Sequence, residues 1–525
     1  MNLLGAGVAS GVLAALALPP FHGWPLAFVA LVPLAVALSK PPPDRRQVAL
    51  AGIGFGAAYY GLLLHWIPFT LHRLMPLGAV VGTLVLVLLG GVGGLQAVFL
   101  RRLLDRGATP ILALPVVWAT TEALFGVAGP FAFPWTPLGL ALARAPEWGG
   151  AAEWGGVGGL TFWIAAVNGA VAGAILAPSR ARRLRLAGLA IVAVGLPAAA
   201  GSARARTLDT TALPRVLVGQ LAVSRDALLA TGLRDASVGA ALDRLVEEAL
   251  ESRGDAGSPP PISLVVFPEA PFAGEWDDEV RPRVRRYAEA LGVEILVGAR
   301  IAGTDPMAAG DANDNADAGD RAAADEGGLR NAVVAILPGG PMDLAHAKRR
   351  LVPGVERPGL VAGPAGAVRQ TEAGRVGVLV CFEVAFSRDA RGLRRDGADL
   401  LVNPTNDGWF SPQVFGMPAA AHAQHRAHLV MRAIEGRMGA VRSSMGGEML
   451  VVDPLGRLVA SSPVGSDGFY AVTPLTSAEV TVHTRFGDLG SPAGVALLLA
   501  LLLPRRRRAP DRTGPGPSTF ADASG

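Results

Sequence analysis

The chain has 525 residues, of which 51% are hydrophobic and 17% are charged, and its formal net charge is +4. Its single cysteine excludes an intramolecular disulfide, and so apolar a composition is unusual for a soluble protein of this length. Residues 1–202 and 489–504 are almost wholly apolar, while 203–488 hold most of the acidic residues. We therefore expect a transmembrane bundle of seven spans (1–202), one large polar domain (203–488) and an eighth span (489–504).

The apolar regions contain eight candidate membrane spans, since a span needs about 20 apolar residues, or somewhat fewer where flanking side chains reach the interface. The first segment lacks the basic start of a signal peptide and further spans follow it at once, so we interpret it as a span. The segments are residues 3–20, 24–38, 47–70, 77–99, 109–127, 157–177, 184–202 and 489–504.

Arginine and lysine in the short loops predict the orientation of these spans. They gather after the second, fourth, sixth and eighth spans, so we expect both termini to be cytoplasmic and the polar domain to face outward. No aromatic-basic patch accompanies the positive charges, and no nucleic-acid partner is expected. The basic groups are Lys40, Arg45 and Arg46; Arg101, Arg102 and Arg106; Arg180, Arg182, Arg183 and Arg185; and Arg505 to Arg508.

The polar domain alternates β-type and helical patterns, which predicts an α/β fold with helices on the outer faces of its sheets. Residues 303–328 lack apolar periodicity and are expected to form a flexible surface insertion, and the basic C-terminal tail, 505–525, is expected to be disordered. Strands are predicted at 215–221, 262–267, 293–299, 332–337, 376–381, 399–403, 438–443 and 448–453, and helices at 234–252, 278–291 and 417–436.

Three stretches of the polar domain carry side chains suited to catalysis. Cys381 closes an apolar run, so we expect it at the carboxyl end of a buried strand, where open α/β sheets place their chemistry. Glu269 follows a predicted strand, and Lys348 lies in a predicted loop. A thiol is only partly ionised at neutral pH, so Glu269 can serve as its base and Lys348 can stabilise a thiolate and a tetrahedral oxyanion.

Lysine is rare in this chain, because Lys40 and Lys348 are the only lysines among 47 basic residues. A surface cation at position 348 would be served equally well by arginine. Retention of lysine there favours a need for a compact point charge, which a guanidinium fork does not provide. Chance survival of one lysine remains the alternative.

The order Glu269, Lys348, Cys381, each at a strand end or in an adjoining loop, resembles the nitrilase (carbon–nitrogen hydrolase) superfamily. Together with the predicted spans, residues 1–504 resemble the apolipoprotein N-acyltransferase family, the last enzymes of bacterial lipoprotein maturation. The resemblance implies a nitrilase-like α-β-β-α sandwich domain inserted in an all-α bundle of eight transmembrane helices. It rests further on Trp118 to Glu122, Phe133 to Trp135, Asn168, Lys348 to Pro353, Cys381 to Glu383, Asn406 to Phe410, Gln424-His425 and Met431 to Glu435.

The resemblance also implies a ping-pong acyl transfer without cofactor or metal. Cys381 would attack the sn-1 ester of a phospholipid, with phosphatidylethanolamine the expected donor, and form a thioester. The α-amine of a diacylated apolipoprotein would then take the acyl chain. Glu269 would be the base in both halves, and Lys348 would stabilise the oxyanion, with the backbone N–H of Phe382 as a second donor. The family implies a monomer in the bacterial inner membrane, with its catalytic domain on the periplasmic side.

Further residues match the family with open alternatives. Glu356 and Glu383 match supporting positions, Glu383 as an orienting group, yet either carboxylate would equally suit a loop ion pair with Arg349, Arg357 or Arg388. Trp409 and Phe410 would line an acyl-chain entrance, or simply pack. Phe382 stands where tyrosine is common, and this departure, with the 303–328 insertion, leaves the acceptor specificity open.

Several histidines and one glutamate within a predicted span allow other interpretations of the site. His422, His425 and His428 share a helical face and would suit a metal, but no further ligand is obviously placed to complete the site. A Cys–His pair using His346 or His425 would leave Glu269 and Lys348 unexplained. Glu122 is costly inside a span and is a candidate for contact with substrate or with another helix.

Two other functions compete with acyl transfer. A membrane-anchored amidase would use the same residues with water as acceptor, although eight spans exceed what a simple anchor needs. A transporter or receptor would use the outer domain only to bind ligand. The few charges within the spans argue against an ion pathway, and binding alone needs no Glu–Lys–Cys set.

Overall fold

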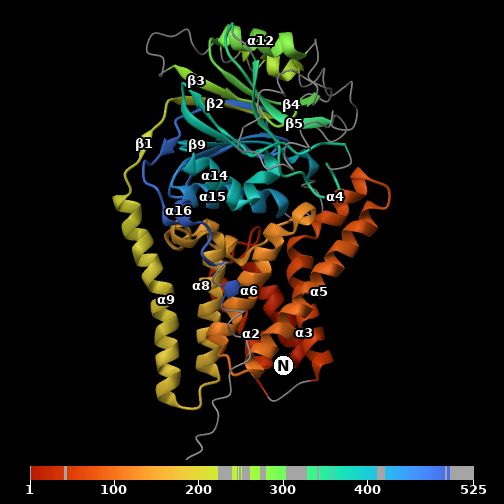
Figure 1. Ribbon diagram of the computed structural model, residues 1–525, viewed down its shortest axis with the longest axis vertical. Coiled ribbons are helices and arrows are strands. Elements are labelled where there is room, and N and C mark those ends of the chain that lie inside the picture. The colour runs from red at the N-terminus through yellow and green to blue at the C-terminus, as the bar shows by residue number, and fades with distance from the viewer. Residues whose placement is uncertain are drawn as a thin grey trace, which may run out of the picture.

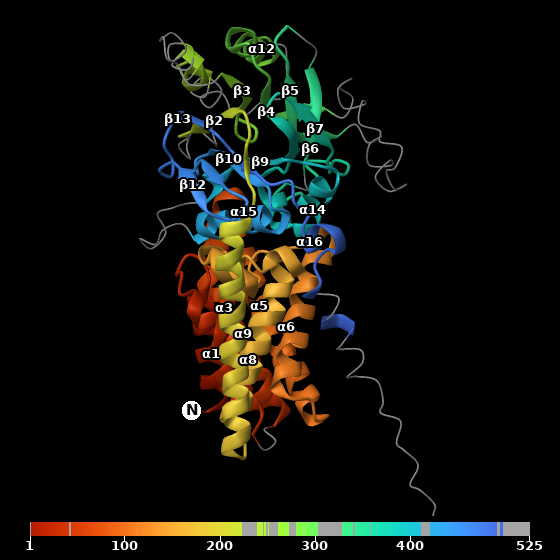
Figure 2. The same cartoon turned by 90° about the vertical axis from the view of Figure 1, so that its left-hand side faces the viewer.

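The computed structural model shows a helical bundle beneath an α/β domain, with the long helix α9 (Arg180–Thr207) leading from one to the other (Figure 1). A view turned by 90° shows the bundle helices running along the long axis and the domain covering one end of the bundle (Figure 2). The structure describes residues 2–40, 44–222, 239–244, 246–247, 250, 261–271, 280–302, 328–339, 342–356, 359–410, 420–490 and 494–496.

The bundle helices coincide with the seven apolar segments expected in residues 1–202. Helices α5, α6, α8 and α9 are long and apolar enough to cross a membrane, and the bent pair α3–α4 can make a fifth span. The first two segments form shorter apolar helices, and residues 497–504 of the last segment lie outside the described residues, so eight spans stay a prediction. The elements are α1 Leu3–Ala17, η1 Trp24–Phe28, α2 Val32–Leu38, α3 Arg45–Leu63, α4 Trp66–Leu74, α5 Gly78–Asp105, α6 Pro110–Val127, η2 Gly129–Phe131, η3 Leu138–Arg144, α7 Pro146–Gly149, α8 Ala152–Ile175 and α9 Arg180–Thr207.

The span predicted at 47–70 is not one straight helix, because it bends by 60° between α3 and α4. Pro68 accounts for the break. Proline has no N–H to donate, and its ring clashes with the carbonyl four residues earlier, which here belongs to Leu64. Helix α3 ends at Leu63, directly before that carbonyl, and α4 begins at Trp66 in a new direction.

The α/β domain is built on one hydrogen-bonded sheet of twelve strands, with the main order β6-β5-β4-β3-β2-β10-β9-β8-β7. All eight predicted strands are present, with their ends shifted by up to a few residues, and four further strands, β6, β7, β12 and β13, were not predicted. The strands are β2 Arg215–Leu221, β3 Ile262–Val266, β4 Ile295–Ala302, β5 Leu329–Ile336, β6 Met342–Ala347, β7 Val368–Thr371, β8 Gly374–Val378, β9 Leu400–Asn406, β10 Gly439–Met445, β11 Leu450–Val452, β12 Leu458–Ser461 and β13 Gly468–Val472; β1 Thr211–Ala212 pairs separately with β14 Leu475–Thr476.

The sheet folds back on itself, so that strands at opposite ends of its order meet in space. The side chain of Arg369 on β7 lies 3.4 Å from that of Asp343 on β6. Val266, Val333 and Val402 belong to one buried apolar cluster that draws on strands from both halves of the sheet. This closure brings the ends of β3, β6 and β8 together at one edge.

Helices cover the outer faces of the folded sheet. Helix α12 (Val280–Leu291) packs on strands β2 to β5, on the side away from the bundle (Figure 1). Helices α14 (Ser387–Arg395) and α15 (Ala420–Gly436) lie between the sheet and the bundle and share one apolar cluster with the bundle helices. A short helix, α16 (Val482–Phe486), follows the last strands.

Several predicted segments fall wholly or partly outside the described residues. The helix predicted at 234–252 is helical wherever it is described, at residues 239–244, 246–247 and 250. Residues 303–327 of the predicted insertion and the whole tail 505–525 lie outside the described residues.

Candidate active site

Glu269 lies three residues beyond the end of β3, and three donors hold its carboxylate. Oε1 accepts hydrogen bonds from Lys348 Nζ and from Asn331 Nδ2, both at 2.7 Å. Oε2 accepts the backbone N–H of Asn406 at 2.9 Å. The side chain is only 6% exposed, so its orientation is fixed by these bonds rather than by solvent.

Lys348 directly follows β6 and lies between two carboxylates. Its Nζ donates to Glu269 at 2.7 Å and to Glu356 Oε1 at 2.9 Å, and its side chain is 1% exposed. Burial by itself would lower the pKa of Lys348, but the charges of Glu269 and Glu356 outweigh it and hold that pKa well above its ordinary value. The ammonium group therefore persists at neutral pH.

Glu356 pairs with Lys348, and Arg357, one of the alternative partners expected for it, lies outside the described residues. Besides Lys348, its Oε1 accepts Asn331 Nδ2 at 3.1 Å, and its Oε2 accepts the backbone N–H of Val352 at 2.7 Å. Asn331, which the sequence analysis did not single out, thus donates to both glutamates and fixes their spacing.

The sequence predicted that Cys381 is the last residue of its strand, but the structure places it beyond the strand. Strand β8 ends at Val378, and Cys381 begins the 3-10 turn η5 (Cys381–Ala385). Its φ is +50°, in the left-handed region that residues with a Cβ rarely adopt. A residue in that region cannot continue a strand, so the chain turns sharply at Cys381.

The thiol of Cys381 is buried beside the charges of the two other predicted catalytic residues. Burial and then the charge of Glu269 raise its pKa above the ordinary range, and Lys348 offsets this only in part. The neutral thiol is therefore the resting form at pH 7. Reaction at sulfur then needs a base that accepts the proton during the attack.

A buried network holds the backbone carbonyl of Cys381. His425 Nε2 lies 3.1 Å and Asn403 Nδ2 3.4 Å from that oxygen. His425 Nδ1 lies 2.9 Å from Asp407 Oδ1. Burial alone would raise the pKa of Asp407, but His425 and Arg442 outweigh it and hold the pKa below its ordinary value. The network fixes the strained turn that carries the thiol, and its sequence signals were the pair Gln424-His425 and the stretch Asn406 to Phe410, which contains Asp407.

Hydrogen bonds to Glu383 connect the loop that follows Lys348 to the turn that carries Cys381. Its Oε2 accepts the backbone N–H of Val380 at 2.7 Å and lies 2.8 Å from His346 Nε2. Its Oε1 accepts the backbone N–H of Arg349 at 2.7 Å. Although burial opposes ionisation, His346 and the backbone amides outweigh it and lower the pKa of Glu383. The bond from Arg349 to Glu383 uses the backbone N–H of Arg349 rather than its guanidinium group.

The three predicted catalytic side chains open into one cavity of about 630 Å³, a size typical of small-molecule sites. Its other walls come from bundle helices as well as from the α/β domain, and they include Leu74 of α4 and Val85 and Leu88 of α5. Leu88 is 72% exposed. The bundle helices α4 and α5 thus give the cavity an apolar wall.

Aromatic rings line the cavity next to Cys381. Phe382 stacks on Phe133 and on Trp135, with ring centroids 5.8 Å apart in both pairs. Trp409 and Phe410 also line the cavity, and Phe410 packs edge-on against Trp66 at 5.1 Å. The rings give the cavity an apolar wall, while the oxyanion role of the Phe382 backbone stays a prediction.

Gln424 joins this aromatic wall to the bundle. Its Oε1 accepts the indole N–H groups of Trp135 at 2.8 Å and of Trp66 at 3.3 Å. Its Nε2 donates to the carbonyl oxygens of Leu63 at 2.9 Å and of Pro19 at 3.3 Å. One buried side chain of α15 thereby fixes elements from three parts of the bundle.

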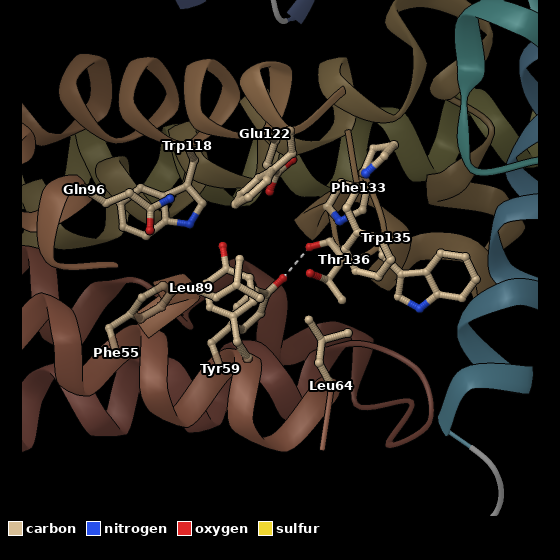
Figure 3. Close-up of a pocket in the computed structure, with 14 residues that line it drawn as sticks. Phe55, Tyr59, Leu64, Leu89, Gln96, Trp118, Glu122, Phe133, Trp135 and Thr136 are labelled. Carbon is tan, nitrogen blue, oxygen red and sulfur yellow. Dashed lines mark hydrogen bonds between the residues drawn. The ribbon is translucent and has the colours of Figure 1, made fainter. Parts of the chain in front are cut away.

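A second, much smaller cavity of about 30 Å³ lies within the bundle (Figure 3). Glu122 lies in its wall and accepts hydrogen bonds from Thr161 Oγ1 at 2.5 Å and from the backbone N–H of Leu138 at 2.8 Å. Across the cavity, Tyr59 donates to the carbonyl oxygen of Thr136 at 2.7 Å (Figure 3). Of the two contacts expected for Glu122, the structure shows the one with another helix.

His346, His425 and His428 are engaged in hydrogen bonds, whereas the nearest charged partner of His422 is Asp407, with Nδ1 and Oδ2 3.8 Å apart. His346 contacts Glu383, and His428 Nε2 lies 3.0 Å from the carbonyl oxygen of Trp135. Within the described residues, Cys381, Asp407 and His425 have candidate ligand atoms within 4.8 Å of one another. Asp407 and His425 already pair, so a metal ion would have to displace that bond. His422, His425 and His428 do not form that group.

Two family models match the chain, the apolipoprotein N-acyltransferase N-terminal domain over residues 10–170 and carbon-nitrogen hydrolase over residues 236–483. The apolipoprotein N-acyltransferase of Geobacter metallireducens is 28% identical over 95% of this chain and 95% of its own length. That of Azotobacter vinelandii is 27% identical over 99% of this chain and 98% of its own. The chain belongs to the apolipoprotein N-acyltransferase family.

Within this family assignment, the first model covers the bundle from α1 into α8, and the second covers Glu269, Lys348 and Cys381. Among solved structures, an amidase from Nesterenkonia sp. is 17% identical and covers 51% of this chain and 92% of the amidase, with a TM-score of 0.33. The two apolipoprotein N-acyltransferase relatives extend over both the bundle and the α/β domain.

Proposed function

We propose that this protein transfers a fatty acyl chain from a membrane phospholipid, through a thioester on Cys381, to the N-terminal amine of S-diacylglyceryl-cysteine apolipoproteins. Membership of the apolipoprotein N-acyltransferase family supports lipoprotein N-acylation. The observation that carries the chemistry is the meeting of Glu269, Lys348 and Cys381 in one largely apolar cavity that α5 helps to line.

In the first half-reaction, Glu269 accepts the proton of the Cys381 thiol while sulfur attacks the sn-1 carbonyl carbon of the donor. The carbonyl oxygen becomes an oxyanion, which the ammonium group of Lys348 stabilises. Collapse of this intermediate breaks the bond to the glycerol oxygen, and Glu269 returns the proton to that oxygen. Lysophospholipid leaves, and the acyl chain remains as a thioester.

In the second half-reaction, the α-amine of the diacylated cysteine attacks the thioester carbon and Glu269 accepts its proton. Lys348 again stabilises the oxyanion. Breaking the carbon–sulfur bond releases the N-acylated lipoprotein, and the proton returns to the sulfur of Cys381. The same base and cation serve both halves because both pass through a tetrahedral intermediate at the same carbon.

The proposal includes the membrane arrangement. Residues 1–202 would form seven spans and 489–504 an eighth, around a nitrilase-like α-β-β-α sandwich at 203–488. The basic loops support cytoplasmic termini and a periplasmic catalytic domain in the bacterial inner membrane. We propose a monomer that uses phosphatidylethanolamine as donor.

The test is the intact mass of the purified full chain after incubation with phosphatidylethanolamine. Unaltered protein should gain one acyl chain that hydroxylamine removes, and Cys381→Ala should gain none. Addition of a synthetic diacylglyceryl-cysteine peptide should discharge the adduct onto the peptide amine. No adduct on folded, unaltered protein would refute the proposal, and discharge of the adduct to free fatty acid alone would favour an amidase.

A further inference from the structure

Arg300 is a second cation in the wall of the catalytic cavity, apart from the Glu269–Lys348–Cys381 set. It lies on β4 directly opposite Asn331 of β5 in an antiparallel pair. Residues paired in this way project from the same face of a sheet. Since Asn331 reaches both Glu269 and the neighbouring Glu356, Arg300 projects toward the same side.

The guanidinium group of Arg300 has its hydrogen-bond donors available. Two cations line the cavity among the residues that the structure describes, and Lys348 is already bonded to Glu269 and Glu356. Within the same described ranges, Arg300 forms no ion pair or side-chain hydrogen bond. Arg300 is only half-buried, so water can solvate it in the empty cavity. A planar fork of N–H donors matches the oxygens of a phosphate group.

The walls of the cavity divide into an apolar part and a polar part. Leu74, Val85 and Leu88 come from the bundle helices α4 and α5. Arg300 and Asn331 come from β4 and β5, which lie above those helices in Figure 1. A glycerophospholipid has the same order of apolar and polar parts, because its ester lies between an apolar tail and a phosphate group.

We infer that Arg300 binds the phosphate group of the glycerophospholipid donor and so orients its sn-1 ester toward Cys381; this assignment rests on the proposed function. Phosphate is common to all glycerophospholipids and absent from neutral acylglycerols. Arg300 therefore selects phospholipids as a class without distinguishing their head groups. The diacylglyceryl-cysteine acceptor carries no phosphate on its lipid, so Arg300 acts only in the first half-reaction.

The experiment measures the rate of acyl-enzyme formation on the full chain in mixed micelles, by intact mass, against the mole fraction of donor. The donors are phosphatidylethanolamine and p-nitrophenyl palmitate, an acyl ester without phosphate. The variants are Arg300→Gln, Arg300→Lys and the control Arg457→Gln, an exposed arginine outside the cavity. Each variant is first checked for an unaltered thermal unfolding profile.

Arg300→Gln should raise the half-saturating mole fraction of phosphatidylethanolamine about ten- to a hundredfold while the maximal rate stays within about threefold, since a charge-assisted hydrogen bond contributes mainly to binding. Arg300→Lys should recover part of the lost affinity for phosphatidylethanolamine, and Arg457→Gln should change neither the half-saturating mole fraction nor the maximal rate. Acylation by p-nitrophenyl palmitate should be the same in all four proteins.

An unchanged half-saturating fraction in Arg300→Gln would overturn the assignment of Arg300 and leave the proposed function intact. Equal losses with both donors would overturn it too, because the residue would then support the site rather than bind phosphate. Failure of the unaltered protein to take an acyl chain from phosphatidylethanolamine would instead overturn the proposed function and the inference with it.

Discussion

Replacing Glu269 by glutamine keeps the size of the side chain but removes its charge, and the consequences can be followed contact by contact. The amide oxygen can still accept from Lys348 and Asn331. The amide nitrogen, however, would face the backbone N–H of Asn406, which is also a donor. We expect a loss of about 1–3 kcal/mol in the free energy of unfolding, the usual cost of unsatisfied buried polar groups.

The same substitution should separate thiol ionisation from catalysis. The charge of Glu269 raises the pKa of Cys381 and Lys348 lowers it, so removing the glutamate charge must lower the pKa of the thiol. Alkylation by iodoacetamide follows the thiolate and should therefore shift to lower pH. Acyl transfer should nevertheless fall by about 10²- to 10⁴-fold, because no base takes the thiol proton or returns it to the leaving alkoxide.

Both effects can be measured on one preparation of the full chain in detergent. Alkylation rates are followed from pH 6 to pH 10 by intact mass, and acyl-enzyme formation is followed with phosphatidylethanolamine at a fixed pH. The control is Asp389→Asn, which removes a carboxylate that pairs with Arg350 and does not line the cavity. The control should acylate at close to the unaltered rate and keep the unaltered alkylation profile.

The reasoning fails if Glu269→Gln acylates within a few fold of the unaltered protein, since Glu269 would then not be the base. It fails separately if the alkylation profile stays in place or moves to higher pH. In that case the charge of Glu269 does not govern the thiol, whatever its role in proton transfer.

Three further variants probe the turn and loops around Cys381. Because the folded-state pKa of Glu383 is lowered, its stabilising contribution is present above its unfolded pKa of about 4.3 and is lost as the pH falls through the folded value. Glu383→Gln should therefore flatten the dependence of Tm on pH below about 5. An unchanged dependence would contradict this expectation. Cys381→Gly should be more stable than Cys381→Ala by about 0.5–1 kcal/mol in the free energy of unfolding, and should therefore unfold at a higher temperature, because glycine adopts φ +50° without strain. The reverse order would argue against a strained turn. His425→Ala should cost about 3 kcal/mol of unfolding free energy by leaving Asp407 without its histidine partner, and it should slow alkylation of Cys381; a loss of stability with unaltered alkylation would limit His425 to a structural role.

The sheet strands that were predicted share one property, an apolar run such as 215–221 or 399–403 buried on both faces. The missed strands lack it. Strand β12 (Leu458–Ser461) is largely exposed, and β6 (Met342–Ala347) contains Asp343 and His346 within its six residues. Their pairing partners decide that they are strands, and pairing over long sequence separations is not encoded in local pattern.

The candidate site was predictable where a residue type is chemically unusual and hidden where it is common. A lone cysteine and a rare lysine draw attention in a chain of arginines, so Cys381 and Lys348 stood out. Asn331 did not, because an asparagine in an apolar run has no signal until its partners, 62 and 25 residues away in the sequence, are placed beside it. The left-handed turn at Cys381 was missed because apolar periodicity continues through it.

The four contacts of Gln424 bear on the order in which the molecule is assembled. The side chain lies 289 residues after Trp135 and 405 residues after Pro19 along the chain. During synthesis, those bundle groups are made long before α15 exists, so their buried N–H and C=O groups must await it. The end of the bundle that lines the large cavity is therefore completed only after the α/β domain has been made and has folded, which keeps an incomplete chain from presenting a finished cavity.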